Sequence, residues 1–141
     1  IYTGEDTLSL HDALPILIEN FKQCHAAFLE ANYDEGMLDS GYYPYYLKER
    51  IRSDKGHLSN KQALDLFVNH KSENMSHVIL SHLSKDNNCP IVVKDLFTKH
   101  AQQTQVIVAS RLQETEVFHV TGSFVSQKAA KSQVAFQTSL F

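Results

Sequence analysis

The sequence predicts a layered α/β domain, because short apolar runs of strand length alternate with segments of helical periodicity. Four apolar runs are expected to form strands, at residues 26–30, 77–81, 105–109 and 117–120. Amphipathic segments that predict helices precede and separate them, at residues 18–23, 44–51, 60–68 and 90–97. No internal repeat is visible, so one domain of alternating helices and strands is expected.

Several residues mark where the helices should begin. Ser59 and Gln62 have capping-box spacing, in which each side chain bonds the other residue's backbone N–H. Pro44 and Pro90 occupy first helical positions, where the fixed φ and missing N–H of proline are tolerated. The segment 34–38, which precedes Pro44, is expected to be a turn or a short helical piece.

Composition excludes several classes of protein. The chain has 141 residues, with 13 basic and 16 acidic side chains and a formal net charge of -3, too balanced to hold DNA or a membrane by bulk charge alone. Two cysteines make neither a disulfide scaffold nor a cysteine-rich zinc module. No apolar run approaches the ~20 residues that span a bilayer. Eight histidines remain to be explained.

The two ends of the chain differ from its middle. Residues 1–16 hold three acids and no base, show no sustained period, and resemble one reading frame of a sequencing adaptor, most clearly over 7–16. We therefore expect a non-native segment at 1–16, although a genuine N-terminal loop is the alternative. Residues 17–120 are expected to form a partial domain, and residues 121–141, polar for most of their length, a flexible tail.

Groups that bind metals or transfer protons lie near the predicted strand ends. Glu30 and Asp34 follow the first strand, His82 follows the second, and His57 stands at a helix entrance. Because ligands gather at the carboxyl ends of parallel strands, these side chains are expected to converge, as a divalent-metal hydrolase requires. The alternatives are a structural His82 or His57 and an Asp34 that only caps the next turn. The other histidines after residue 16 are expected at the surface or at an edge: His25, His70, His77, His100 and His119.

Three segments together resemble the metallo-β-lactamase superfamily: FLEANYD (28–34), GHLSN (56–60) and ILSHLSKDNN (79–88). In order and spacing they are similar to the second half of the nuclease-type members, most like the bacterial DNA exonucleases and less like tRNase Z. The resemblance covers residues 17–120. It implies the C-terminal half of an αββα sandwich with a two-metal site at one edge.

The resemblance also implies roles for individual residues. His82 matches the last histidine ligand of the family, and His57 matches the histidine that assists proton transfer to the leaving group. Glu30 matches the acid that orients that histidine. Asp34 matches a residue of the exonuclease branch and is a candidate metal ligand, and Tyr33 stands where that branch often has histidine.

The implied activity is hydrolysis of phosphodiester bonds in DNA by two divalent metals, zinc or manganese, in the cytoplasm and without a membrane partner. The family's His-x-His-x-Asp-His motif is absent from this chain, so the fragment is expected to be inactive alone. An RNA-processing or small-molecule hydrolase of the same fold is the alternative enzyme. One cluster of basic residues has two interpretations, a groove that binds phosphates or the solvated face of a helix. The cluster consists of Lys48, Arg50, Arg52 and Lys55.

The last five residues resemble the motif that docks into the bacterial DNA sliding clamp. Gln137, Leu140 and Phe141 are the expected contacts, because two apolar side chains on a flexible tail can enter a pocket of a partner. A non-catalytic module that binds the clamp through this tail is a further alternative, and an apolar end that folds back on the domain is another.

Overall fold

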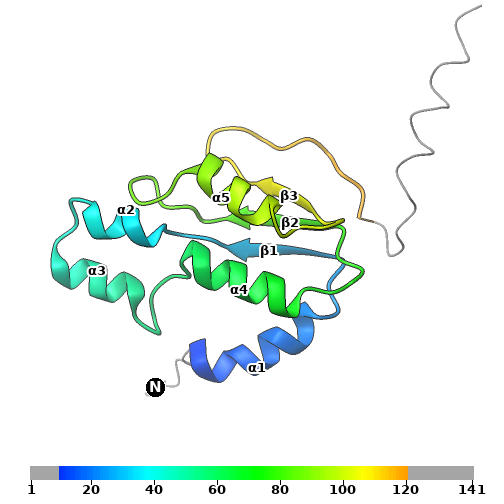
Figure 1. The fold of residues 1–141 in the computed structure, drawn as a ribbon, viewed down its shortest axis with the longest axis horizontal. Coiled ribbons are helices and arrows are strands. Elements are labelled where there is room, and N and C mark those ends of the chain that lie inside the picture. The colour runs from blue at the N-terminus through cyan, green and yellow to red at the C-terminus, as the bar shows by residue number, and fades with distance from the viewer. Residues whose placement is uncertain (1–9, 121–141) are drawn as a thin grey trace, which may run out of the picture.

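The structure, a computed structural model, describes the backbone of residues 10–120 and the side chains of residues 15–120 (Figure 1). Helices and strands alternate through this range, as the fold class predicted. In chain order the elements are α1 (Leu10–Phe21), β1 (Ala26–Glu30), α2 (Glu35–Ser40), α3 (Tyr45–Arg52), α4 (Asn60–His70), β2 (His77–Ser81), α5 (Pro90–Thr98) and β3 (Gln105–Val108).

The three strands form a parallel sheet in the order β1-β2-β3. Successive parallel strands that advance in one direction, each through a right-handed crossover, place the connecting helices on the same face. The buried side chains agree with this arrangement: Leu29, Val78 and Leu80 point to one face and belong to one core with residues of α4 and α5. Helices α1, α4 and α5 therefore cover a single face of the described sheet.

The opposite face carries no helix in the described part of the chain. Ile79 is buried there, while Phe28 on the edge strand remains exposed. His77 is also buried, and its ring stacks on Phe118 with centroids 4.9 Å apart. The segment after β3 thus covers part of this face without joining the sheet.

Local signals in the sequence set most element boundaries. Ser59 accepts a bond from the Gln62 N–H, and the Gln62 side chain accepts one from the Ser59 N–H, so the predicted capping box is present. Pro90 is the first residue of α5, whereas Pro44 precedes α3 as its N-cap. The first two strands have the predicted bounds, and the third ends one residue earlier than expected.

Three expectations are wrong. Residues 117–120 form no strand, because strand composition alone does not place a run alongside a sheet edge, and Phe118 stacks on His77 instead. The first helix, expected at residues 18–23, runs from Leu10 to Phe21, so it begins inside the segment expected to be non-native and contains Pro15; a proline inside a helix removes one backbone hydrogen bond, and its ring crowds the carbonyl of the preceding turn. His77, expected at the surface or an edge, is buried.

No helix in the described range is both long and apolar enough to cross a lipid bilayer.

Candidate functional site

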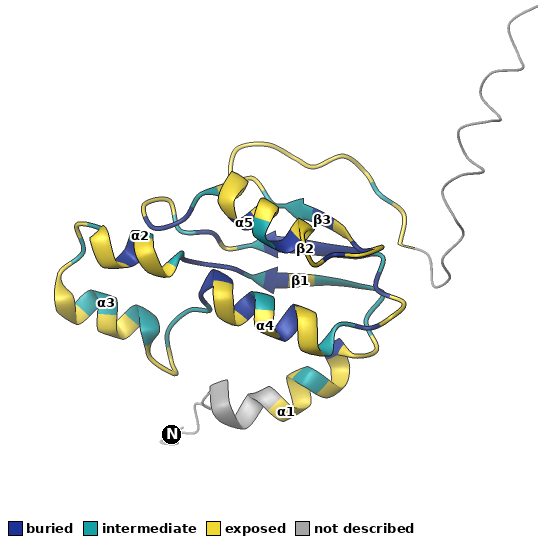
Figure 2. Cartoon of the chain, in the orientation of Figure 1, coloured by how far each residue is buried: buried dark blue, intermediate teal, exposed yellow. Residues whose placement is uncertain are grey.

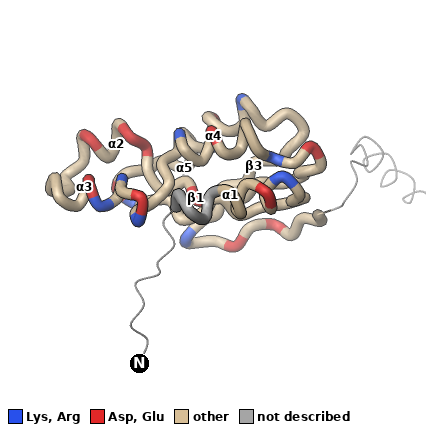
Figure 3. The backbone as a smooth tube through the Cα atoms, turned by 90° about the horizontal axis from the view of Figure 1, so that it is seen from below, with Lys and Arg blue, Asp and Glu red and all other residues tan. Residues whose placement is uncertain are grey.

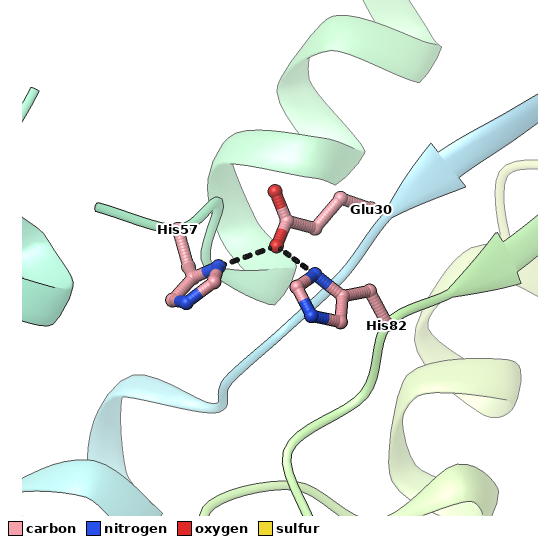
Figure 4. A group of neighbouring side chains, drawn as sticks. All are labelled: Glu30, His57 and His82. Atoms are coloured by element: carbon pink, nitrogen blue, oxygen red, sulfur yellow. Dashed lines mark hydrogen bonds and ion pairs between the residues drawn. The ribbon is translucent and has the colours of Figure 1, made fainter. Parts of the chain in front are cut away.

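Three side chains from separate segments meet at the carboxyl end of the sheet: Glu30, His57 and His82 (Figure 4). The Glu30 Oε1 atom lies 2.7 Å from His57 Nδ1 and 2.8 Å from His82 Nδ1. The two imidazole rings touch edge to face, with centroids 5.0 Å apart. Sequence reasoning predicted this convergence, and among the described residues this is the single group of three or more possible metal ligands of its kind.

The shared carboxylate oxygen fixes which histidine nitrogens carry protons. An ionised carboxylate only accepts hydrogen bonds, so each Nδ1 that bonds Glu30 Oε1 must be a donor. In the neutral form of each ring the proton is then on Nδ1, and Nε2 keeps its lone pair. This leaves Nε2 of His57 and of His82 as the atoms able to bind a metal or exchange a proton.

The ends of two neighbouring strands bring Glu30 and His82 together. Glu30 pairs with Ser81 in the parallel register, so the next residue, His82, lies beside the carboxylate. His82 has a left-handed backbone conformation with φ of 59°, which turns the chain sharply out of the strand. The Asn32 side-chain amide donates to the His82 carbonyl over 2.6 Å and holds this turn. The imidazole is 66% exposed and open to a ligand.

His57 reaches the same point from the loop between α3 and α4. Its backbone N–H donates to the Ile51 carbonyl over 2.9 Å, which ties it to the last turns of α3. Gly56 makes this approach possible, because a Cβ there would overlap the Ile51 carbonyl oxygen. Leu58 accepts a bond from the Asn32 N–H, so the loop is also fixed to the segment that follows β1.

Buried asparagines join the three segments that carry the site. The Asn88 amide donates to the carbonyls of Ala31 and Asn32 and forms a reciprocal amide pair with Asn60, at distances of 2.8 to 3.0 Å. Its Oδ1 also accepts from the Cys89 N–H. We call Asn32, Asn60 and Asn88 the asparagine network. It links the residues after β1, the start of α4 and the residues after β2 within the interior.

Sequence reasoning missed this network. Asn88 lies in a stretch interpreted as a polar loop, and Asn32 and Asn60 lie inside motifs in which only the ionisable residues drew attention. All three are buried. An asparagine that is polar in composition but buried in the fold has no single-residue signal. The available clue was that each of the three motifs that carry the resemblance contains one of these asparagines.

Asp34 is placed differently from the other predicted site residues. Its Oδ1 accepts a bond from the Met37 N–H over 3.0 Å and caps α2, the alternative foreseen for it. It does not belong to the three-residue group, and its role as a metal ligand stays a prediction. The neighbouring Tyr33 is buried. Burial, followed by the negative charge of Glu35, raises the pKa of Tyr33 above its usual value.

Other predicted residues fall outside the site. Arg52 pairs with Asp39 and with Glu49, so this member of the basic cluster is neutralised locally. The clamp-binding candidates Gln137, Leu140 and Phe141 lie outside the described residues, and that interaction stays a prediction.

The chain is similar in sequence to two bacterial nucleases, although no family model matches it. It is 37% identical over 83 residues to exodeoxyribonuclease WalJ of Streptococcus pneumoniae, covering 59% of this chain and 30% of the relative. It is 40% identical over 67 residues to exodeoxyribonuclease YycJ of Bacillus anthracis, covering 48% of this chain and 25% of the relative. The chain therefore spans less than a third of the length of the curated exodeoxyribonucleases that it matches.

Proposed function

We propose that this chain supplies one part of the active site of a metal-dependent DNA exonuclease of the metallo-β-lactamase fold. The main support for this proposal is that Glu30, His57 and His82 lie together at the carboxyl end of a parallel sheet, in a chain similar to exodeoxyribonucleases. Helices cover one face of the described parallel sheet, whereas parallel sheets are usually buried on both faces. This supports the fold assignment, in which a second layer packs on the other face. A second layer would come from a longer polypeptide.

The donor chemistry fits zinc or manganese, because imidazole nitrogen and carboxylate oxygen bind both ions. His82 offers an exposed Nε2 whose ring is oriented by Glu30, the arrangement typical of a histidine ligand. A catalytic zinc commonly takes three protein ligands, so residues beyond this chain would complete a two-metal site. When bound, such metals polarise a phosphate and activate water.

His57 is suited to the proton transfer that completes hydrolysis. As water adds to phosphorus, the bond from phosphorus to the leaving oxygen breaks, and that oxygen needs a proton. Protonated His57 would donate it from Nε2, while Nδ1–H remains bonded to Glu30. Glu30 acts here as a positioning residue, because one carboxylate oxygen orients both rings.

Metal binding by the 141-residue chain tests the incompleteness of the site. Titration with Zn²⁺ or Mn²⁺ should show no pair of tightly held ions, and assays with linear DNA should show no turnover. Any weak binding should decrease in His82→Ala and persist in the control His100→Ala, which removes an exposed histidine distant in sequence from the site. Two tightly held ions per chain would contradict the proposal.

Activity has to be measured on a polypeptide of this gene extended to the length of the relatives. His57→Ala should lower kcat by about 10²- to 10⁴-fold, the usual contribution of a general acid or base. Glu30→Gln should also lower kcat and alter its pH profile, because the amide oxygen is a weaker acceptor and carries no negative charge to stabilise a protonated imidazole. Full activity in His57→Ala, or an upstream sequence without a His-x-His-x-Asp-His motif, would refute the enzyme assignment.

A further inference from the structure

Three tyrosines at the start of α3 are exposed to an unusual degree. Tyr42, Tyr45 and Tyr46 have relative exposures of 105%, 77% and 74%, and we call them the tyrosine patch. Helix α3 contains no buried residue, and Figure 2 shows it entirely in the intermediate and exposed colours. Aromatic rings usually gain stability by leaving water, so three adjacent exposed rings that support no core point to a ligand.

The tyrosine patch lies near the candidate site. In Figure 1, α2 and α3 project beyond the carboxyl end of β1, the end at which Glu30 stands. The His57 N–H bonds Ile51, and Tyr45 precedes Ile51 by six residues on the same helix, about 9 Å along its axis. A DNA strand advances ~3.4 Å per nucleotide. A DNA strand that follows α3 from Tyr45 to the turn that contacts His57 would therefore span about three nucleotides.

Charges around the tyrosine patch favour an anionic ligand. Residues 42–55 hold four basic and two acidic side chains, a local net charge of +2 in a chain whose total is -3. Figure 3 shows both signs along α3. Lys48 is one turn from Tyr45, and Arg50 is one turn from Tyr46, so cations share the helix faces of the rings. Among the described residues Arg50 forms no ion pair, unlike Arg52.

We propose that the tyrosine patch is a stacking platform for unpaired bases of a DNA strand, with Lys48 and Arg50 beside its phosphates. This inference rests on the proposed function and names how the substrate is held. Stacking on aromatic rings tolerates any base, as a sequence-independent nuclease requires. The large hydrophobic residues exposed at the start of α3 are all tyrosines, whose rings offer flat faces on which bases can stack.

Binding of a labelled oligothymidylate to the 141-residue chain in EDTA tests the platform, because binding is then separated from hydrolysis. Each of Tyr45→Ala and Tyr46→Ala should raise Kd about 5-fold or more, and the double variant about 25-fold or more. The paired Tyr→Phe variants should bind nearly as the parent does, since phenylalanine keeps the stacking surface. Arg50→Gln should lower the salt slope of log Kd by about 0.7.

Ile91→Ala is the matched control, because it removes another exposed apolar side chain at a helix start, 71% exposed, and should leave Kd unchanged. Far-UV circular dichroism checks that each variant is folded. Three results would overturn the proposal: no binding by the parent chain, parental Kd in the folded double alanine variant, or equal affinity for duplex DNA. Self-association lost in the same tyrosine variants would instead assign the patch to a second copy.

The outcomes separate this inference from the proposed function. If the extended protein fails to hydrolyse DNA but the oligonucleotide binds through the tyrosines, the platform stands and the nuclease assignment fails. If hydrolysis depends on His57 while binding ignores the tyrosines, the platform fails and the nuclease assignment stands.

Discussion

The asparagine network and the tyrosine patch differ in environment: the network places polar side chains in the interior, and the patch places aromatic side chains in water. Asn88 is polar and buried, with hydrogen bonds to residues of two other segments. Tyr45 and Tyr46 are aromatic and exposed, in a helix without a buried residue. A buried amide must be paired, so it determines how segments meet. An exposed ring imposes no such requirement, so stability does not explain its presence. Substitutions in the two regions should therefore affect different properties.

Asn88→Ala should have the largest effect on stability. It removes the partner of two backbone carbonyls, of the Asn60 amide and of the Cys89 N–H, and leaves them buried. Each buried unpaired group costs about 1–3 kcal/mol, so a loss of about 3–5 kcal/mol in the free energy of unfolding is expected. Urea titration followed by circular dichroism measures it. Asn69→Ala, an exposed position on α4, should change stability by less than about 0.5 kcal/mol; equal losses would show that the network has no special role.

Gly56→Ala should have the next largest effect, because it acts where α3 joins the site. An added Cβ would overlap the Ile51 carbonyl oxygen, and backbone atoms must then move. Overpacking of this kind costs about 1–3 kcal/mol. The bond from the His57 N–H to Ile51 should weaken, and hydrogen exchange of that amide should accelerate. Gly36→Ala is the control, since its Cβ would meet no backbone atom and only one side-chain oxygen, Asp34 Oδ1 at 3.3 Å. Unchanged exchange at His57 would indicate that α3 and the site are not coupled.

The paired substitution Tyr45→Ala and Tyr46→Ala should have the smallest effect on stability. Both rings are largely in water, and exposed substitutions usually change the free energy of unfolding by less than about 0.5 kcal/mol each. Thermal unfolding of the double variant measures this directly. A loss of more than about 2 kcal/mol would show that the rings support the fold, and the distinction between the two regions would disappear.

Local sequence signals predicted the elements whose boundaries depend on neighbouring residues. The bounds of β1 and β2 follow from short apolar runs, and the start of α4 follows from Ser59 and Gln62. The prediction was wrong where a contact with a residue distant in sequence determines the structure. Residues 117–120 have the composition of a strand but pair with no edge of the described sheet, and Phe118 stacks instead on His77, a residue that lies forty-one positions earlier and is buried.

The sequence by itself determined the α/β class and the positions of most elements, because strand and helix periodicity are local properties. It also led us to expect that Glu30, Asp34, His57 and His82 converge at the carboxyl ends of the strands, and all but Asp34 meet in one group. Only the tertiary structure decided that one carboxylate oxygen serves both histidines and that Asn88 joins three segments. The physical reason is that hydrogen bonds across 27 to 57 residues depend on how the chain packs. A residue's type determines which hydrogen bonds its side chain can donate or accept, while the whole fold determines which partner it meets.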